Sequence, residues 1–197
     1  MSGLWVFVCG PSGAGKDSVL GWAAQELAAR QDIVFARRVV TRASHPGSDH
    51  DEVSPEQFAR LIDGDGLAWR WQAHGFHYGI QACYATQVAA GRVVVVNGSR
   101  EHVSTLQAAG HLRVVQIDVE AALLAERLAQ RRRDTPQDVL RRLARNALLP
   151  NLRAHCTILN QGELAHAGRQ LVGYLMASRG AKPSAASVLS LRSVISP

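Results

Sequence analysis

The feature that most constrains this chain is a glycine-rich loop placed directly after a short apolar segment. Residues 4 to 9 are apolar, and residues 10 to 16 read Gly-Pro-Ser-Gly-Ala-Gly-Lys. The glycines of this GxxxxGK spacing let the backbone point successive amides at a polyphosphate, and the lysine adds a positive charge. A helix predicted from Asp17 to Arg30 would add its N-terminal amides. The sequence therefore predicts a nucleotide-binding P-loop between a buried strand and a helix.

The position after the lysine departs from the usual P-loop. It holds Asp17 in place of the Ser or Thr that ordinarily ligates Mg²⁺, and Ser18 follows. Because Mg²⁺ prefers oxygen ligands, Asp17 is the candidate metal ligand, directly or through water. A glycine turn that binds nothing is disfavoured, since strand, spacing, lysine and helix agree. The residues expected to bind the nucleotide are Gly10, Pro11, Ser12, Gly13, Ala14, Gly15, Lys16, Asp17 and Ser18.

Length and composition fit a single α/β domain with a short appendage. The chain has 197 residues, of which 47% are hydrophobic. Its three cysteines are odd in number and suit a reducing compartment. No apolar stretch is long enough for a membrane span, and the N-terminus does not read as a leader. We therefore expect a cytoplasmic protein without membrane contact. The net charge of +6 comes with no recognisable nucleic-acid-binding motif, so no nucleic acid is expected as a partner.

Short segments rich in Val and Ile alternate with helical stretches, which predicts an α/β P-loop NTPase fold with a doubly wound parallel sheet. The strands are expected at residues 4–9, 33–40, 92–97, 113–118 and 156–160. The helices are expected near 17–30, 81–90, 99–109, 120–132, 136–148 and 163–178.

Two segments depart from this alternation. Ser54, Pro55 and Gln57 form a helix start with a capping box, so a short helix should run from Pro55 to about Asp63. Residues 69–80 carry aromatics and suggest an inserted small strand or lid. We expect one kinase-like domain over 1–179, with an inserted acceptor region at about 42–80, a lid at about 127–145 and a loosely ordered tail at 180–197.

Arginines dominate the basic residues, with lysine only at positions 16 and 182. One cluster, Arg37, Arg38 and Arg42, follows the second expected strand, where ligands collect in a doubly wound sheet. The other lies in the expected lid, where guanidinium groups would neutralise a transferring phosphoryl group. Two alternatives are a solvated basic face and a compositional bias of the genome. The lid residues expected to take part in catalysis are Arg131, Arg133 and Arg142, together with Lys16 from the loop.

The order of these motifs resembles the guanylate-kinase-like P-loop kinases. It rests on the P-loop, Val-Thr-Arg at 40–42, Asp-His-Asp-Glu-Val-Ser at 49–54, His-Gly-Phe-His-Tyr-Gly at 74–79 and Arg-Arg-Asp-Thr-Pro at 132–136, and covers roughly residues 3 to 178. The resemblance implies that Arg38, Arg42 and Tyr78 bind the acceptor phosphate and that Asn160 lies near the adenine of ATP.

At several positions this sequence differs from the guanylate kinase pattern, and these differences indicate a different acceptor. Guanylate kinases bind guanine with a carboxylate and a hydroxyl, whereas residues 67–80 contain no acidic side chain and place Ile80 at the hydroxyl position. Asn97 stands where those enzymes carry an Asp that helps hold Mg²⁺. Asn97, together with Lys-Asp-Ser at 16–18 and the pattern WxxHGxxYGI at 71–80, resembles the ribose 1,5-bisphosphate kinases. That resemblance implies ATP- and Mg²⁺-dependent conversion of a phosphorylated sugar, ribose 1,5-bisphosphate, to 5-phosphoribosyl 1-diphosphate in bacterial phosphonate catabolism.

Several alternatives stay open at this point. Asn97, Ser99 and Arg100 are candidates for binding the ribose or its 5-phosphate, or else form an ordinary turn from strand to helix. Asp49, Asp51 and Glu52 either orient sugar hydroxyls or the acceptor arginines, or belong to a solvated loop, which is the preferred interpretation. The other activities considered are a GMP-type nucleotide kinase and a non-catalytic nucleotide-binding module. A homodimer is compatible with the sequence but not established by it.

Overall fold

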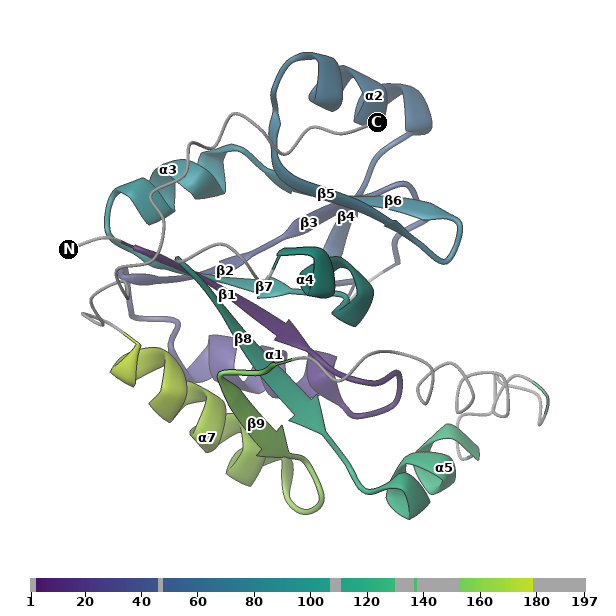
Figure 1. The fold of residues 1–197 in the computed structure, drawn as a ribbon, viewed down its shortest axis with the longest axis vertical. Helices are drawn as coiled ribbons and strands as arrows, with labels where there is room; N and C mark the ends of the chain where they lie inside the picture. Colours follow the sequence, from purple (N-terminus) through teal and green to yellow (C-terminus); the bar gives the residue numbers. More distant parts are fainter. Residues whose placement is uncertain (1–2, 46–47, 107–110, 130–136, 138–152, 179–197) are drawn as a thin grey trace.

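Five parallel strands form the central sheet of the protein (Figure 1). The computed structural model describes residues 3–45, 48–106, 111–129, 137 and 153–178. The sheet has the order β2-β7-β1-β8-β9, and every neighbouring pair is parallel. This arrangement confirms the predicted doubly wound α/β fold. Its strands are β1 (Leu4–Cys9), β2 (Ile33–Ala36), β7 (Val93–Asn97), β8 (Leu112–Asp118) and β9 (Cys156–Leu159).

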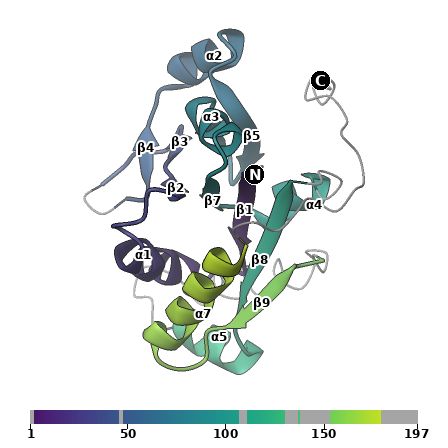
Figure 2. The same cartoon turned by 90° about the vertical axis from the view of Figure 1, so that its left-hand side faces the viewer.

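Side chains of β1 alternate between two hydrophobic clusters, one on each face of the sheet. Val6 and Val8 pack with helices α1 (Lys16–Glu26), α5 (Ala121–Ala129) and α7 (Leu164–Ala177). Figure 2 shows α1 and α7 side by side on this face. Trp5 and Phe7 lie on the opposite face, which α3 (Cys83–Ala89) and α4 (Arg100–Leu106) cover. Burial on both sides explains why β1 is a continuous apolar run.

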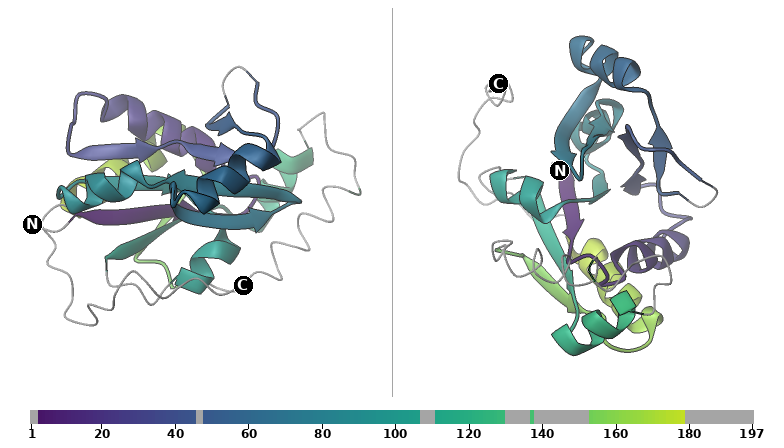
Figure 3. Two further views of the ribbon diagram at one scale, coloured as in Figure 1. Left: turned by 90° about the horizontal axis from the view of Figure 1, so that it is seen from above. Right: turned by 90° about the vertical axis from the view of Figure 1, so that its right-hand side faces the viewer.

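A second, smaller sheet lies between the core and helix α2 (Pro55–Asp63), at the end of the molecule opposite α5 (Figure 3). We call it the acceptor sheet, after the acceptor region predicted at about 42–80; its strand order is β4-β3-β6-β5. Its strands are β3 (Arg38–Val40), β4 (His50–Glu52), β5 (Leu67–Ala73) and β6 (Phe76–Gln81). The prediction of one strand over 33–40 was wrong, because Arg37 separates β2 of the core from β3 of the acceptor sheet. The expected small strand at 69–80 is a hairpin of two strands.

Helix α2 begins as predicted. The Ser54 hydroxyl accepts a hydrogen bond from the Gln57 backbone N–H (3.1 Å), and the Gln57 side-chain oxygen accepts one from the Ser54 N–H (2.7 Å). The expected helix at 136–148 apart from Gln137, the tail at 180–197, and the lid residues Arg131, Arg133 and Arg142 lie outside the described residues. Within the part of the chain that the structure describes, no helix is long and apolar enough to cross a bilayer.

Candidate functional site

The glycine-rich loop has the backbone that its sequence requires. Gly13 and Gly15 have φ values of 101° and 78°, in the left-handed region that favours glycine. A Cβ at Gly15 would lie 2.5 Å from the Nδ2 atom of Asn160, so a larger residue would not fit. That Nδ2 donates a hydrogen bond to the Ala14 carbonyl (2.8 Å). The structure thus places the buried Asn160 side chain against the loop backbone, where it holds the loop in shape.

Asn97, at the end of β7, joins the loop lysine to two carboxylates. Its Oδ1 accepts a hydrogen bond from Lys16 Nζ, which also donates to Asp17 Oδ1 at 3.0 Å. Its Nδ2 donates to Asp17 Oδ1 (2.9 Å) and to Asp49 Oδ2 (2.5 Å). An amide both accepts and donates, whereas an ionised carboxylate only accepts. Asparagine is therefore the residue type that can bridge a cation and two anions at this position.

Arg38 extends this network onto the acceptor sheet. Its Nη2 donates to Asp49 Oδ2, and its guanidinium carbon lies 5.7 Å from the centroid of the Tyr78 ring. Arg37 turns away and pairs with Asp51 (2.6 Å), and Arg42 is exposed. A continuous chain of polar contacts thus runs from Lys16 through Asn97 and Asp49 to Arg38. We refer to these four residues as the bridging network.

Both carboxylates in the site are held in the ionised form. Desolvation by the surrounding protein would raise the pKa of Asp17, but the charge of Lys16 and hydrogen bonds from Lys16 and Asn97 lower it below its ordinary value. Desolvation would also raise the pKa of Asp49, but the charge of Arg38 together with hydrogen bonds from His50 and Asn97 lowers it below its ordinary value. Two carboxylates that share one amide nitrogen offer close oxygen ligands. That donor set fits Mg²⁺, which takes one or two protein carboxylates together with substrate phosphates.

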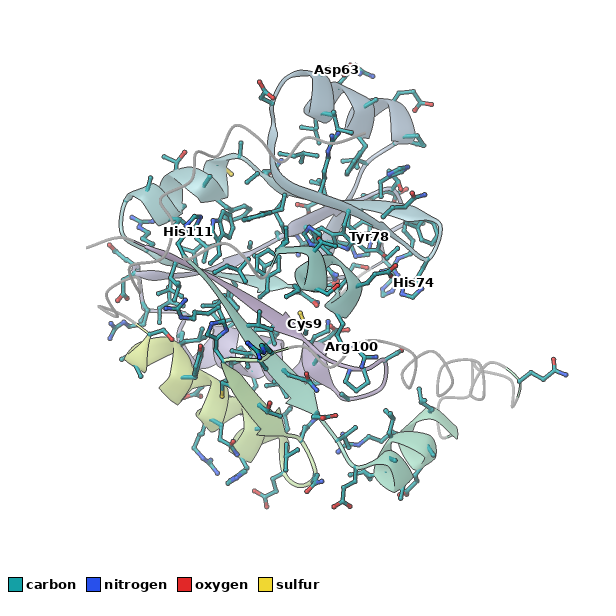
Figure 4. All side chains as sticks on the ribbon, in the orientation of Figure 1. Cys9, Asp63, His74, Tyr78, Arg100 and His111 are labelled. Atoms are coloured by element: carbon teal, nitrogen blue, oxygen red, sulfur yellow. The ribbon has the colours of Figure 1, made fainter. Side chains whose placement is uncertain are left out.

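The turn after β7 carries the remaining candidates. Ser99 is half-buried, and its carbonyl accepts the Val103 N–H (3.0 Å) at the start of α4. Arg100 lies with Cys9 near the carboxyl end of β1 (Figure 4), and desolvation is the main reason that its pKa is lowered. Burial raises the pKa of the Cys9 thiol to about 12, so this cysteine stays protonated.

Sequence reasoning left one residue of this region open and missed another. For Asp49 the preferred interpretation was a solvated loop and the alternative was a carboxylate that orients the acceptor arginines; its carboxylate links Asn97 to Arg38, which favours the alternative. The signal that could have found it is its position directly before β4, the strand that pairs with Arg38's own strand. His102 was not singled out, and it packs against Phe7, Trp69 and Trp71. A lone histidine on a short helix offers no pattern from which to predict this.

Comparison with known proteins finds relatives over most of the chain. It is 41% identical over 180 residues to ribose 1,5-bisphosphate phosphokinase PhnN of Agrobacterium fabrum, covering 89% of this chain and 97% of that protein. The protein of the same name from Acidiphilium cryptum is 42% identical over 178 residues, with 90% and 95% covered. Guanylate kinase from Anaplasma phagocytophilum shares the fold, with a TM-score of 0.66, 18% identity, and 91% and 87% of the two chains covered. No family model matches the sequence.

Proposed function

The chain belongs to the ribose 1,5-bisphosphate phosphokinase family, and from this premise we propose that it transfers the γ-phosphoryl group of ATP to the 1-phosphate of ribose 1,5-bisphosphate. The products are 5-phosphoribosyl 1-diphosphate and ADP. The observation that carries the proposal is the bridging network, which joins the P-loop lysine to an arginine of the second sheet. A phosphoryl-transfer enzyme must hold donor and acceptor phosphates in line, and in this proposal Lys16 would face the donor and Arg38 the acceptor.

The acceptor's chemistry is compatible with carboxylates that are already ionised, as Asp17 and Asp49 are in the described part of the site. A phosphate monoester has a second pKa near 6 and arrives largely as a dianion at neutral pH. Its oxygen attacks the γ-phosphorus, the bond between that phosphorus and the bridging oxygen breaks, and ADP leaves. No proton has to be removed first. The protein therefore contributes positioning and neutralisation of charge.

Each candidate residue has a role in this proposal. Lys16 and the loop amides hold the β- and γ-phosphates. The 1-phosphate is bound by Arg38, Arg42 and Tyr78. The ribose and its 5-phosphate are bound by Asn97, Ser99 and Arg100. Asp17, with Asp49 beside it, would hold Mg²⁺, which neutralises phosphate oxygens when bound. The lid residues, which the structure does not describe, complete the neutralisation in the transfer step: Arg131, Arg133 and Arg142.

The wider setting is inferred from the family resemblance. We infer a cytoplasmic enzyme of phosphonate catabolism, built as one kinase domain over residues 1–179, with a tail at 180–197. The cysteines in the described residues, Cys9, Cys83 and Cys156, are free thiols, in keeping with a reducing compartment. A homodimer stays a prediction from the sequence.

Phosphorus NMR of the purified protein tests the proposed activity. One tube contains ATP, Mg²⁺ and ribose 1,5-bisphosphate, and a second contains GMP in place of the sugar. A new diphosphate signal with ADP in the first tube alone is the expected result. The Lys16→Ala variant is the control and should give no such signal. Turnover of GMP would overturn the choice of acceptor. ADP release without a new diphosphate in either tube would show that the protein hydrolyses ATP without transfer to the sugar.

A further inference from the structure

A column of stacked planar groups connects the acceptor arginine to helix α4. The Arg38 guanidinium lies against Tyr78, with 5.7 Å between its carbon and the ring centroid. Tyr78 stacks on Trp71, with 5.4 Å between centroids and 9° between planes. Trp71 in turn stacks on His102, at 4.7 Å and 13°. The labelled Tyr78 in Figure 4 lies where the acceptor sheet faces α4. Four groups from β3, β6, β5 and α4 thus form one continuous stack.

The core of the protein fixes the His102 end of this column. The residue is 9% exposed, and its ring meets Phe7 (6.0 Å) and Trp69 (6.3 Å) in edge-to-face geometry. Its Nδ1 atom has no hydrogen-bond partner among the described residues. Burial lowers the pKa of His102 to about 4, so the ring is uncharged at neutral pH. The imidazole therefore contributes a flat apolar surface to the stack, not a charge.

The Arg38 end of the column is set up to bind an anion. The side chain is only 12% exposed, with Tyr78 against its face and Asp49 at Nη2. Its buried Nε has no partner among the residues that the structure describes. A guanidinium fork suits phosphate through paired donors. Since one face is covered and one edge is held, the direction of the remaining donors is set by the ring beneath them.

We propose that His102 is a positioning residue for the acceptor phosphate: it supports Trp71, which supports Tyr78, against which the Arg38 guanidinium is oriented. The inference rests on the proposed function, because it concerns the same acceptor site. It also links the two substrates. Asn97, which contacts Lys16, is separated from His102 by four residues of one turn and helix start. One short segment therefore sets the lysine on the donor side and the arginine on the acceptor side.

The test compares substitutions that keep or remove the flat ring. His102→Phe keeps a ring of similar shape, His102→Ala removes it, and Val103→Ala opens a cavity in the same helix and cluster without touching the column. For each variant, KM values for ribose 1,5-bisphosphate and for ATP are measured, together with the Kd of the sugar by titration calorimetry. His102→Ala should weaken the binding of ribose 1,5-bisphosphate about three- to ten-fold, which is the effect expected for the loss of one aromatic stacking contact. The KM for ATP should stay within about two-fold. His102→Phe and Val103→Ala should resemble the wild type.

A double-mutant cycle separates positioning from general loss of structure. In an Arg38→Ala background, His102→Ala should cause no further loss of sugar affinity, because the group it positions is gone. Equal losses in both backgrounds would overturn the proposal, as would a matching rise in the KM for ATP or failure of His102→Phe to restore sugar binding. If His102→Ala does not fold, Trp71→Leu interrupts the column at its middle and must give the same pattern.

The same measurements distinguish this inference from the proposed function. Binding of ribose 1,5-bisphosphate by the wild type without turnover would refute the proposed reaction, and the Kd values would still test the column. Absence of both binding and turnover would overturn the two together.

Discussion

Lowering the pH tests the burial of His102 independently of any substrate. Burial gives the folded protein a His102 pKa of about 4, against 6.5 for an exposed histidine. Between these values the unfolded chain binds a proton that the folded protein does not. The free energy of unfolding should therefore rise with pH across this window and level off above it. The full difference between the two pKa values corresponds to about 3 kcal/mol in the free energy of unfolding, of which about 2.5 kcal/mol is already lost at pH 4.5.

His102→Phe is the matched variant, because it keeps a ring in the same place and cannot titrate. Urea unfolding followed by circular dichroism would be measured for both proteins at several pH values between 4.5 and 7.5. Carboxylates, and His155 with its lowered pKa, titrate in both proteins, so they cancel in the difference. Between pH 7.5 and 4.5, the free energy of unfolding of the wild type should fall by about 2.5 kcal/mol more than that of His102→Phe. Parallel curves for the two proteins would refute the reasoning, because they would mean that His102 accepts a proton in place.

Three further predictions follow from other parts of the structure. Lys16→Ala should lower the rate of ADP formation by about three orders of magnitude with an unchanged dichroism spectrum; a tenfold effect or less would contradict its role on the donor phosphates. Asn97→Asp removes the donor to Asp17 and Asp49, whose side chains are 74% and 40% exposed, and adds a third carboxylate. After allowance for solvent screening, the variant should lose about 2 kcal/mol, or about 4–8 °C in melting temperature. Millimolar Mg²⁺ should reverse this loss of stability in Asn97→Asp and not in Asn97→Ala, as measured by thermal shift assays. Equal responses of the two variants would argue against a metal at this position. A Cβ at Gly168 would lie 2.1 Å from Trp22 Cε3, so Gly168→Ala should cost about 1–3 kcal/mol in urea unfolding. Gly173→Ala in the same helix meets nothing within 4 Å and should cost nothing; similar losses in both would show that helix packing at Trp22 is not the cause.

The core and the P-loop could be predicted from the sequence because their signals are local. An apolar run, a glycine spacing and a lysine within residues 4–16 fix a strand, a loop and a helix start together. Likewise Ser54 and Gln57 contain the whole α2 capping box within one turn. In these places the residues that make the contacts are neighbours in the chain, so the pattern and the structure carry the same information.

The acceptor sheet could not be predicted in the same way. Strands β3 and β4 have three residues each, too few for a period to show, and they pair in parallel across a long loop. The pair Arg37 and Arg38 within an otherwise apolar run was the available signal for two strands in place of one. The role of Asp49 depends on the register that sets His50 opposite Arg38. Register of this kind is a tertiary property, and so is the stack that ends on His102.

The charges of the described site bear on the role proposed for the arginine-rich segment. Lys16 and Arg38 are balanced by Asp17 and Asp49, so the bridging network together with Asp17 is close to neutral before any substrate enters. Each acceptor phosphate brings a charge of about −1.5 to −2, and the nucleotide adds more. Positive charge must therefore come from outside the network. Arg127, at the end of α5, already has a guanidinium nitrogen 3.9 Å from where a Gly15 Cβ would lie. Arg131, Arg133 and Arg142 follow Arg127 in the sequence, and we propose that they supply this charge to the transferring phosphoryl group.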